Sequence, residues 1–327
     1  MSMTRRALLS ALSATGMSLS VAACSSSGDG GDDAKARFGY IADYNGASLL
    51  AIADQRGLWK KHGLTADYKV FVNGPVQIQA LGTGNLDYGY IGPGALWLPA
   101  SGKATIVAVN TLTYADRVIA RPGITSVRGL RGRKVGVPEG TSGEMALNLA
   151  LQQAGMAMDD ISKVVMDAPT VVSAFASGKI DGAGIWYPLI DTIKAKVPGM
   201  EEVASTEDIP GSTFPTAFLT GAKRRPERDE KVVKVLQEAN DWRAAHPKES
   251  IALAAKMLKA DQTTVAADAG HVKTMTTADL VTKTEDGSVG KWLDGMCRFF
   301  TRTGQLAKTP DPAGFYDGDL YTKAAAK

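Results

Sequence analysis

The sequence predicts an α/β fold of two lobes, each a mostly parallel sheet flanked by helices, with two crossovers between them. Short strand-like runs alternate with helical patterns over residues 37–221, and such alternation is typical of parallel sheets. Glycine-containing loops follow the expected strands in both halves of the chain. The segments 111–116 and 211–216 interrupt the alternation, and we interpret them as the two crossovers.

Four strands are expected in the first half, over residues 37–41, 68–72, 88–91 and 105–109. The helix after the first strand is expected to end at Gly57, because glycine tolerates the left-handed backbone of a helix end. In such sheets ligands bind beyond the carboxyl ends of the strands, so the loops after the first three strands together predict a binding site. Each loop taken alone is also an ordinary strand-to-helix turn. The predicted ligand-binding residues here are Asp43, Asn45, Gly46, Asn73, Gly92 and Pro93.

The segment 129–188 is interpreted as strand, loop, helix, strand, helix and strand. The β-branched run Lys134–Val137 stops at Pro138, which cannot donate to a strand ladder. A helix with a buried face is expected over Glu144–Ala154. Its N-terminus would direct unpaired N–H groups outward, which suits an anion. Ligand contacts are therefore expected from Gly140, Thr141 and Ser142, although Thr141 also suits a simple helix cap.

Four motifs in this order resemble the solute-binding proteins of ABC importers. They are A-I-A-D-Q-R-G-L-W-K-K-H-G-L from Ala51, Q-A-L-G-T-G-N-L-D-Y-G-Y-I-G from Gln79, L-R-G-R-K-V-G-V-P-E-G-T from Leu130 and A-F-A-S-G-K-I-D-G-A-G-I-W-Y-P from Ala174. The chain resembles the branch that binds aliphatic sulfonates, taurine, nitrate and thiamine precursors, over residues 37–240. This resemblance implies a periplasmic-binding-protein type II fold, in which two lobes close on a solute.

The resemblance also implies ligand contacts at the 140–142 loop and at the aromatic–proline corner Trp186–Pro188. Trp186 and Tyr187 would form a wall against an apolar part of the solute, with core packing as their alternative role. Phe214 is a further candidate for this wall.

Asp43 and Glu144 leave the charge of the solute open. If both face the cleft, they require a cation or an N–H donor, as in the ammonium of taurine or an aminopyrimidine. If they do not, Glu144 is a capping residue with Thr141 at the N-cap and has no ligand role.

Few arginines lie near the predicted site, and Arg117 and Arg121 are expected outside it. The helix N-termini therefore favour a singly charged organic anion or zwitterion, such as a sulfonate or taurine. The alternatives are nitrate, a thiamine-precursor pyrimidine, or an aromatic carboxylate held between Trp97, Trp186, Tyr187 and Phe214.

The N-terminal segment is interpreted as an export signal over residues 1–23, with a twin-arginine-like pair at Arg5 and Arg6 and a lipobox that ends at Cys24. Cys24 would then carry a lipid that anchors the protein at the outer face of the cytoplasmic membrane. Residues 24–34 are expected to be a flexible tether. We assign residues 35–113 and 217–327 to the first lobe and residues 114–216 to the second.

These observations lead to one functional interpretation: an extracytoplasmic solute-binding component that delivers its solute, as a monomer, to the permease and ATPase subunits of an ABC importer. A receptor for a surface sensor is the alternative of another class. No enzyme activity is expected, because the related fungal enzyme for the thiamine pyrimidine depends on a cysteine cluster that this chain lacks.

Other partners are not expected. The two cysteines, Cys24 and Cys297, and the three dispersed histidines do not form a metal or cofactor pattern. The formal net charge is +3 and no basic run alternates with aromatic residues, so no nucleic-acid partner is expected.

Overall fold

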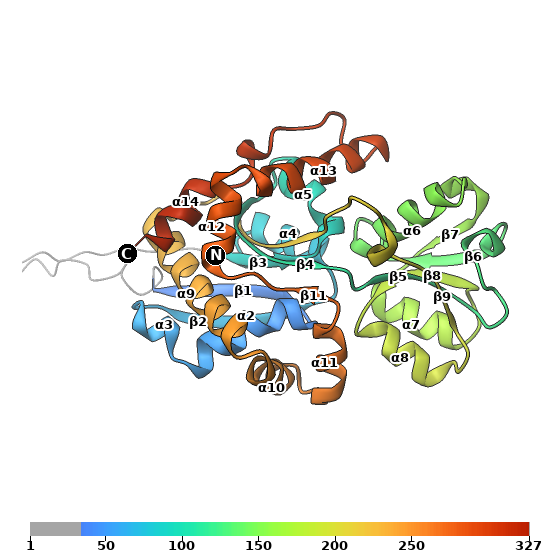
Figure 1. The fold of residues 1–327 in the computed structure, drawn as a ribbon, viewed down its shortest axis with the longest axis horizontal. Helices are drawn as coiled ribbons and strands as arrows, with labels where there is room; N and C mark the ends of the chain where they lie inside the picture. Colours follow the sequence, from blue (N-terminus) through green and yellow to red (C-terminus); the bar gives the residue numbers. More distant parts are fainter. Residues whose placement is uncertain (1–33, 327) are drawn as a thin grey trace, which may run out of the picture.

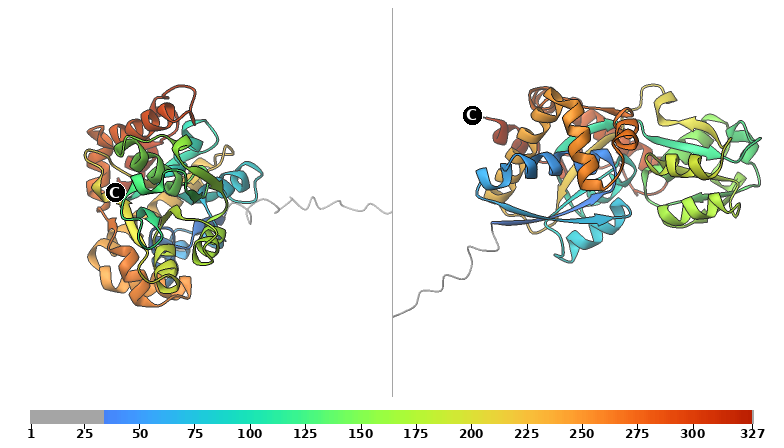
Figure 2. Two further views of the ribbon diagram at one scale, coloured as in Figure 1. Left: turned by 90° about the vertical axis from the view of Figure 1, so that its right-hand side faces the viewer. Right: turned by 90° about the horizontal axis from the view of Figure 1, so that it is seen from below.

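The computed structural model describes residues 34–326, which form two lobes side by side along the long axis of the molecule (Figures 1 and 2). Lobe 1 is the six-stranded sheet with strand order β11-β4-β10-β3-β1-β2 and its helices. Lobe 2 is the five-stranded sheet with order β7-β6-β8-β5-β9 and its helices. The predicted signal segment 1–23, Cys24 and most of the tether lie outside the described residues.

The chain enters lobe 2 between β4 and β5 and returns between β9 and β10. The strands of lobe 1 are β1 (Lys35–Ile41), β2 (Thr65–Phe71), β3 (Tyr88–Ile91), β4 (Thr105–Thr113), β10 (Pro215–Thr220) and β11 (Val272–Lys273). Those of lobe 2 are β5 (Asp116–Ala120), β6 (Lys134–Val137), β7 (Ser162–Val165), β8 (Gly182–Trp186) and β9 (Glu201–Ser205).

Helices cover both faces of each sheet. In lobe 1 they are α2 (Tyr44–Gln55), α3 (Leu58–Lys61), α4 (Gly74–Gly82), α5 (Trp97–Ala100), α9 (Pro226–Ala245), α10 (Pro247–Leu258), α11 (Gln262–Ala269), α12 (Thr277–Glu285), α13 (Ser288–Arg302) and α14 (Gly318–Ala325). In lobe 2 they are α6 (Ser142–Gln153), α7 (Ala168–Ala176) and α8 (Leu189–Lys196). Short 3-10 turns are η1 (Pro93–Ala95), η2 (Val127–Leu130), η3 (Met158–Asp160), η4 (Thr206–Asp208) and η5 (Pro312–Gly314). None of the described helices is long and apolar enough to cross a membrane.

The α/β fold with two helix-flanked sheets is confirmed, and both sheets are mixed. In lobe 1, β2 and β3 pair parallel with β1, whereas β10 pairs antiparallel with both β3 and β4. In lobe 2, β6 pairs parallel with β7 and β8, whereas β5 pairs antiparallel with β8 and β9. The exceptions have one cause. Strands β5 and β10 each follow a crossover, so they enter their sheet from the end at which the parallel strands leave it.

The core of lobe 1 is one cluster, with Phe38 stacked on Tyr88 at 5.0 Å between ring centroids. The sheet of lobe 2 separates two smaller clusters, one under α7 and α8 and the other under α6. Helix α6 packs directly on β8, since a Cβ atom at Gly143 would lie 2.3 Å from the carbonyl oxygen of Gly184. This close approach fixes the N-terminus of α6 at the end of the sheet that faces lobe 1.

Candidate ligand-binding site

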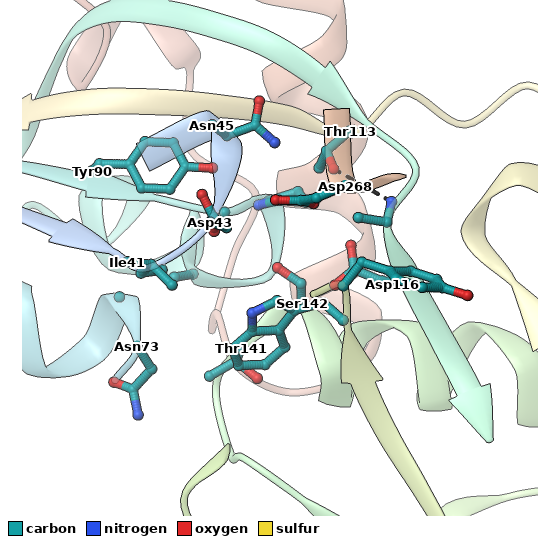
Figure 3. A pocket seen from close by; sticks show the side chains of 17 residues that line it. Ile41, Asp43, Asn45, Asn73, Tyr90, Thr113, Asp116, Thr141, Ser142 and Asp268 are labelled. Atoms are coloured by element: carbon teal, nitrogen blue, oxygen red, sulfur yellow. Dashed lines mark hydrogen bonds between the residues drawn. The ribbon is translucent and has the colours of Figure 1, made fainter. Parts of the chain in front are cut away.

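A cavity of about 460 Å³, including space open to solvent, lies between the two lobes (Figure 3). It is formed where β1, β2 and β3 of lobe 1 end, opposite the start of α6 and the end of β8 in lobe 2. The predicted residues that line it are Asp43, Asn45, Asn73, Gly92, Pro93, Thr141, Ser142, Trp186 and Tyr187.

Three other predicted residues, Gly46, Gly140 and Phe214, do not line the cavity, because each interacts with neighbouring protein groups instead. The Gly46 N–H group donates to Asp43 Oδ1 at 2.6 Å, inside the first turn of α2. Gly140 accepts a hydrogen bond at its carbonyl oxygen from Trp97 Nε1 at 3.2 Å, across the lobe boundary. Phe214 is buried in the core of lobe 1, edge-on to Tyr114.

Glu144 does not line the cavity either, and the predicted capping arrangement is present in part: Thr141 is the N-cap of α6 and Glu144 lies in its first turn. Its carboxylate is buried, forms an ion pair with Lys163 and accepts the Gly140 N–H at 2.7 Å. The hydroxyl of Thr141 donates to the Pro138 carbonyl oxygen at 2.6 Å and accepts no N–H from α6. The strand stops at Pro138, so this carbonyl takes its donor from the loop, and Glu144 stabilises the loop through Gly140.

Two carboxyl groups that the sequence did not point to lie in the cavity beside Asp43. Asp116 begins β5 and Asp268 lies near the end of α11. Asp43, Asp116 and Asp268 are only 7%, 2% and 1% exposed. We call these three residues the acidic trio, and Figure 3 shows them around the same space, with Thr141 and Ser142 nearby.

The acidic trio changes the electrostatics predicted for lobe 1. Asp43 Oδ1 accepts the Gly46 N–H, and Asp268 Oδ2 accepts the Tyr44 N–H at 2.6 Å. Two carboxyl groups therefore already accept hydrogen bonds at the N-terminus of α2, which is one of the helix N-termini predicted to favour an anionic group. The start of α6 remains a predicted site for an anionic group, since Thr141 and Ser142 line the cavity.

Burial makes these carboxyls hard to ionise. Burial raises the pKa of Asp43 to about 7, and the nearby charge of Asp116 adds to the effect. Burial likewise raises the pKa of Asp116 to about 7, against the lowering influence of Arg117. The pKa of Asp268 is raised well above its usual range by burial and by the charge of Asp43.

Aromatic side chains complete the lining, with Tyr90 from β3, Trp186 at the end of β8 and Tyr187 directly after it. Beyond the cavity, the ring of Tyr187 stacks on His271 of lobe 1 at 4.4 Å between centroids. Arg117 lies outside the lining, as expected, and pairs with Glu202 at 2.8 Å.

On the other side of the cavity the two backbones come very close. The Gly94 N–H donates to Ser142 Oγ at 3.3 Å. A Cβ atom at Gly94 would lie 2.2 Å from the backbone nitrogen of Ser142, so this approach requires glycine.

The chain is similar in sequence to a known protein family and to known proteins. Residues 47–250 match the family described as NMT1/THI5 like. A putative binding protein of Brucella abortus (strain 2308) is 53% identical over 295 residues, which cover 89% of this chain and 92% of the relative. The chain belongs to the NMT1/THI5-like family.

Two relatives of this family member carry more specific names. A putative aliphatic sulfonates-binding protein of Bacillus subtilis (strain 168) is 25% identical over 69% of this chain and 71% of its own. The taurine-binding periplasmic protein of Escherichia coli (strain K12) is 25% identical over 41% of this chain and 43% of its own. The predicted relationship to solute-binding proteins of this branch is thereby confirmed.

Solved structures share the fold. The alkanesulfonate-binding protein SsuA from Xanthomonas axonopodis pv. citri has a TM-score of 0.69 at 20% identity, over 86% of this chain and 98% of its own. The desulfurization enzyme DSZB has a TM-score of 0.64 at 15% identity, over 89% of this chain and 98% of its own. One fold therefore serves binding proteins and an enzyme, and the residues of the site have to distinguish them.

Proposed function

We propose that this family member is the extracytoplasmic solute-binding component of an ABC importer, which captures a small zwitterionic organic solute of the taurine type by lobe closure. The observation that carries the proposal is a cavity lined from both lobes, at the point where two crossovers join them. A solute in this position contacts both lobes at once, so its binding stabilises the closed form. Named relatives that bind taurine and sulfonates support the solute class.

The cavity lining suits a solute with two different ends. The start of α6 offers N–H groups and the hydroxyl of Ser142 to an anionic group. The acidic trio, which lines the same cavity, suits an ammonium group or another N–H donor. An aminopyrimidine shares the second property, whereas nitrate and aromatic carboxylates offer no N–H donor to these acids.

The proposed hinge consists of the two crossovers. Residues 114–115 separate β4 from β5, and residues 206–214 separate β9 from β10. On this basis we keep the predicted division into a mobile lobe from residue 114 and a second lobe, but move its far boundary from residue 216 to the 206–214 crossover, because Pro215 and Thr216 begin β10 of lobe 1. Parting of the lobes would release the hydrogen bonds from Trp97 to Gly140 and from Gly94 to Ser142.

We further propose that the solute leaves unchanged and that the protein works at the outer face of the cytoplasmic membrane. Cys297, the cysteine among the described residues, is buried in the core of lobe 1 and is not a cavity residue. Lipid attachment at Cys24 would keep the protein, as a monomer, beside its permease and ATPase subunits.

The test is a thermal-shift screen of the chain from Ser25 onward with taurine, alkanesulfonates, nitrate, aromatic carboxylates and aminopyrimidines. A solute present at a hundredfold its dissociation constant adds about 2.7 kcal/mol to the free energy of unfolding. A stabilising solute is then followed by small-angle scattering, which should show a more compact particle. Stabilisation without compaction would contradict capture by lobe closure, and a chemically altered solute would contradict binding without reaction.

A further inference from the structure

We infer that Asp43, Asp116 and Asp268 form a subsite for a nitrogen cation or N–H-donating group of the solute, and that a cation entering it displaces about one proton from these carboxyls. The inference deepens the proposed function and rests on it, since it concerns the solute of the same cavity. The observations that support the inference do not depend on the relatives. They are the carboxyl oxygens without a hydrogen-bond partner, the charged residues around the three carboxyls and the aromatic side chains of the cavity lining.

Two carboxyl oxygens in the cavity lining are buried without a hydrogen-bond partner. They are Oδ1 of Asp116 and Oδ1 of Asp268. A buried acceptor left unpaired costs about 1–3 kcal/mol, and more when it is charged. A donor group in the cavity would remove this cost, so the two oxygens favour a solute that donates hydrogen bonds to them.

The charged residues around the acidic trio do not supply that donor. Arg117 is the nearest cation to Asp116, but its guanidinium donates to Glu202, to the Tyr114 carbonyl oxygen and to the Asp116 carbonyl oxygen. His271 stacks on Tyr187 and faces Arg117.

The groups on the remaining sides do not pair with these two oxygens either. Asp191 contributes a further negative charge near Asp268. Tyr90 faces Asp43 with a phenol that remains neutral, because burial raises its pKa far above the usual range. In lobe 1, Arg243 is bound to Ser48, Asn110 and Asn240. The site therefore gathers three carboxyl groups, two of which have an oxygen that an N–H-donating solute could pair with.

An organic cation fits the lining better than a metal ion. Among residues 34–326, no group of three or more His, Cys, Asp or Glu side chains is arranged to hold a metal. Tyr90, Trp186 and Tyr187 line the same cavity, and aromatic faces attract cations with about 0.5–2 kcal/mol each. An alkylammonium, an amidine or an amino-heterocycle would use the acids and the aromatic wall together.

Proton displacement follows from the position of three buried carboxyls on one cavity, because burial and their mutual charge keep them from ionising together. Near neutral pH the empty site still holds protons, because the pKa values of Asp43 and Asp116 are about 7 and that of Asp268 is higher. A cation that enters favours the ionised carboxyls, so protons pass to the solvent. Below pH 7 each displaced proton weakens the affinity about tenfold per pH unit.

The experiment measures binding to the chain from Ser25 onward by calorimetry at pH 6 and pH 8, in two buffers of different ionisation enthalpy. The probes are matched pairs: taurine with ethanesulfonate, benzamidine with benzamide, and 4-aminopyrimidine with pyrimidine. We expect the more basic or N–H-richer member of one pair to bind at least tenfold more tightly and to release about one proton. Asp116→Asn and Asp268→Asn should each weaken its binding at least tenfold. Asp167→Asn is the control, because Asp167 is an exposed helix cap that does not line the cavity and Asn caps equally well.

Four results would overturn the inference. They are equal binding of the partner molecules, binding without proton release, full binding by Asp116→Asn, and stabilisation by Mg²⁺ or Zn²⁺ in place of every nitrogen compound. Native mass spectrometry of the protein from its own host separates this inference from the proposed function. A co-purified solute without nitrogen refutes the subsite and leaves solute capture intact. If no solute co-purifies and no probe binds, both proposals fail.

Discussion

Replacement of Asp116 by asparagine should stabilise the unliganded protein at pH 8, although it removes part of the proposed site. The Asp116 side chain is buried, and its Oδ1 atom has no hydrogen-bond partner. The folded protein must ionise this group in a poor environment, whereas the unfolded chain ionises it in water. Asparagine has nearly the same shape and carries no charge, so the variant avoids the cost of ionisation.

The magnitude follows from the pKa, which burial raises from 3.8 to about 7. Between these values the folded protein keeps a proton that the unfolded chain has lost, so the free energy of unfolding falls as the pH rises through this window. The stabilising contribution is complete below about pH 4 and is lost above about pH 7. A difference of about 3 pH units at about 1.4 kcal/mol each gives about 4 kcal/mol.

The assay is thermal unfolding of wild type and Asp116→Asn at pH 4.5 and pH 8. An unpaired amide group retains part of the cost, so we expect the variant to gain about 2–4 kcal/mol at pH 8, or about 4–8 °C in Tm. At pH 4.5 the two proteins should be nearly equal. A variant that is less stable at pH 8, or a difference that does not depend on pH, would show that Asp116 is not a destabilised buried acid.

Three further substitutions test the architecture. Gly94→Ala should weaken solute binding about tenfold to a hundredfold and prevent the compaction seen by scattering, since its Cβ would meet the Ser142 backbone; Gly290→Ala, in open space, is the control. Lys163→Met should lower the free energy of unfolding in urea by about 3 kcal/mol, because the buried carboxylate of Glu144 loses its ion-pair partner. A Glu144→Gln change in that variant should restore much of the lost free energy. Arg243→Met should lower the free energy of unfolding by about 3 kcal/mol, because Asn110 and its other partners lose their donor; an unchanged Tm would contradict this role.

The sequence was sufficient for the parts of the site that follow from strand ends. The loops after β1, β2 and β3 were predicted from glycine and asparagine directly after apolar runs, and Asp43, Asn73 and Gly92 line the cavity there. The helix over Ser142–Gln153 was predicted within two residues at its start and one at its end, and Gly57 has the expected left-handed backbone, with φ of 64°. Such features depend on neighbours in the chain, so a local pattern reveals them.

The acidic trio required the structure. Asp268 reaches the cavity only because α10 and α11 pack beside α2, more than 200 residues earlier in the chain, and an aspartate in a helix has no local mark of burial. Asp116 offered a signal, namely an acid at the start of a fully buried strand directly after a crossover. For Glu144 the sequence did not reveal the ion pair. An acid in the first turn of a helix looks like a cap, and the partner of Glu144, Lys163, lies on the neighbouring strand β7.

The position of β10 has a consequence for how this chain is made. Strand β10 lies between β3 and β4 and pairs with both, so it joins them into one sheet. It begins at Pro215, after all of lobe 2 in the sequence. A growing chain that has not reached this point carries the three strands β2-β1-β3 with an open edge on β3, and a β4 strand without either neighbour, and such edges are templates for aggregation. Lobe 2 is one continuous segment and can form first. Folding should therefore finish late and through distant contacts, and chains that end before residue 215 should aggregate.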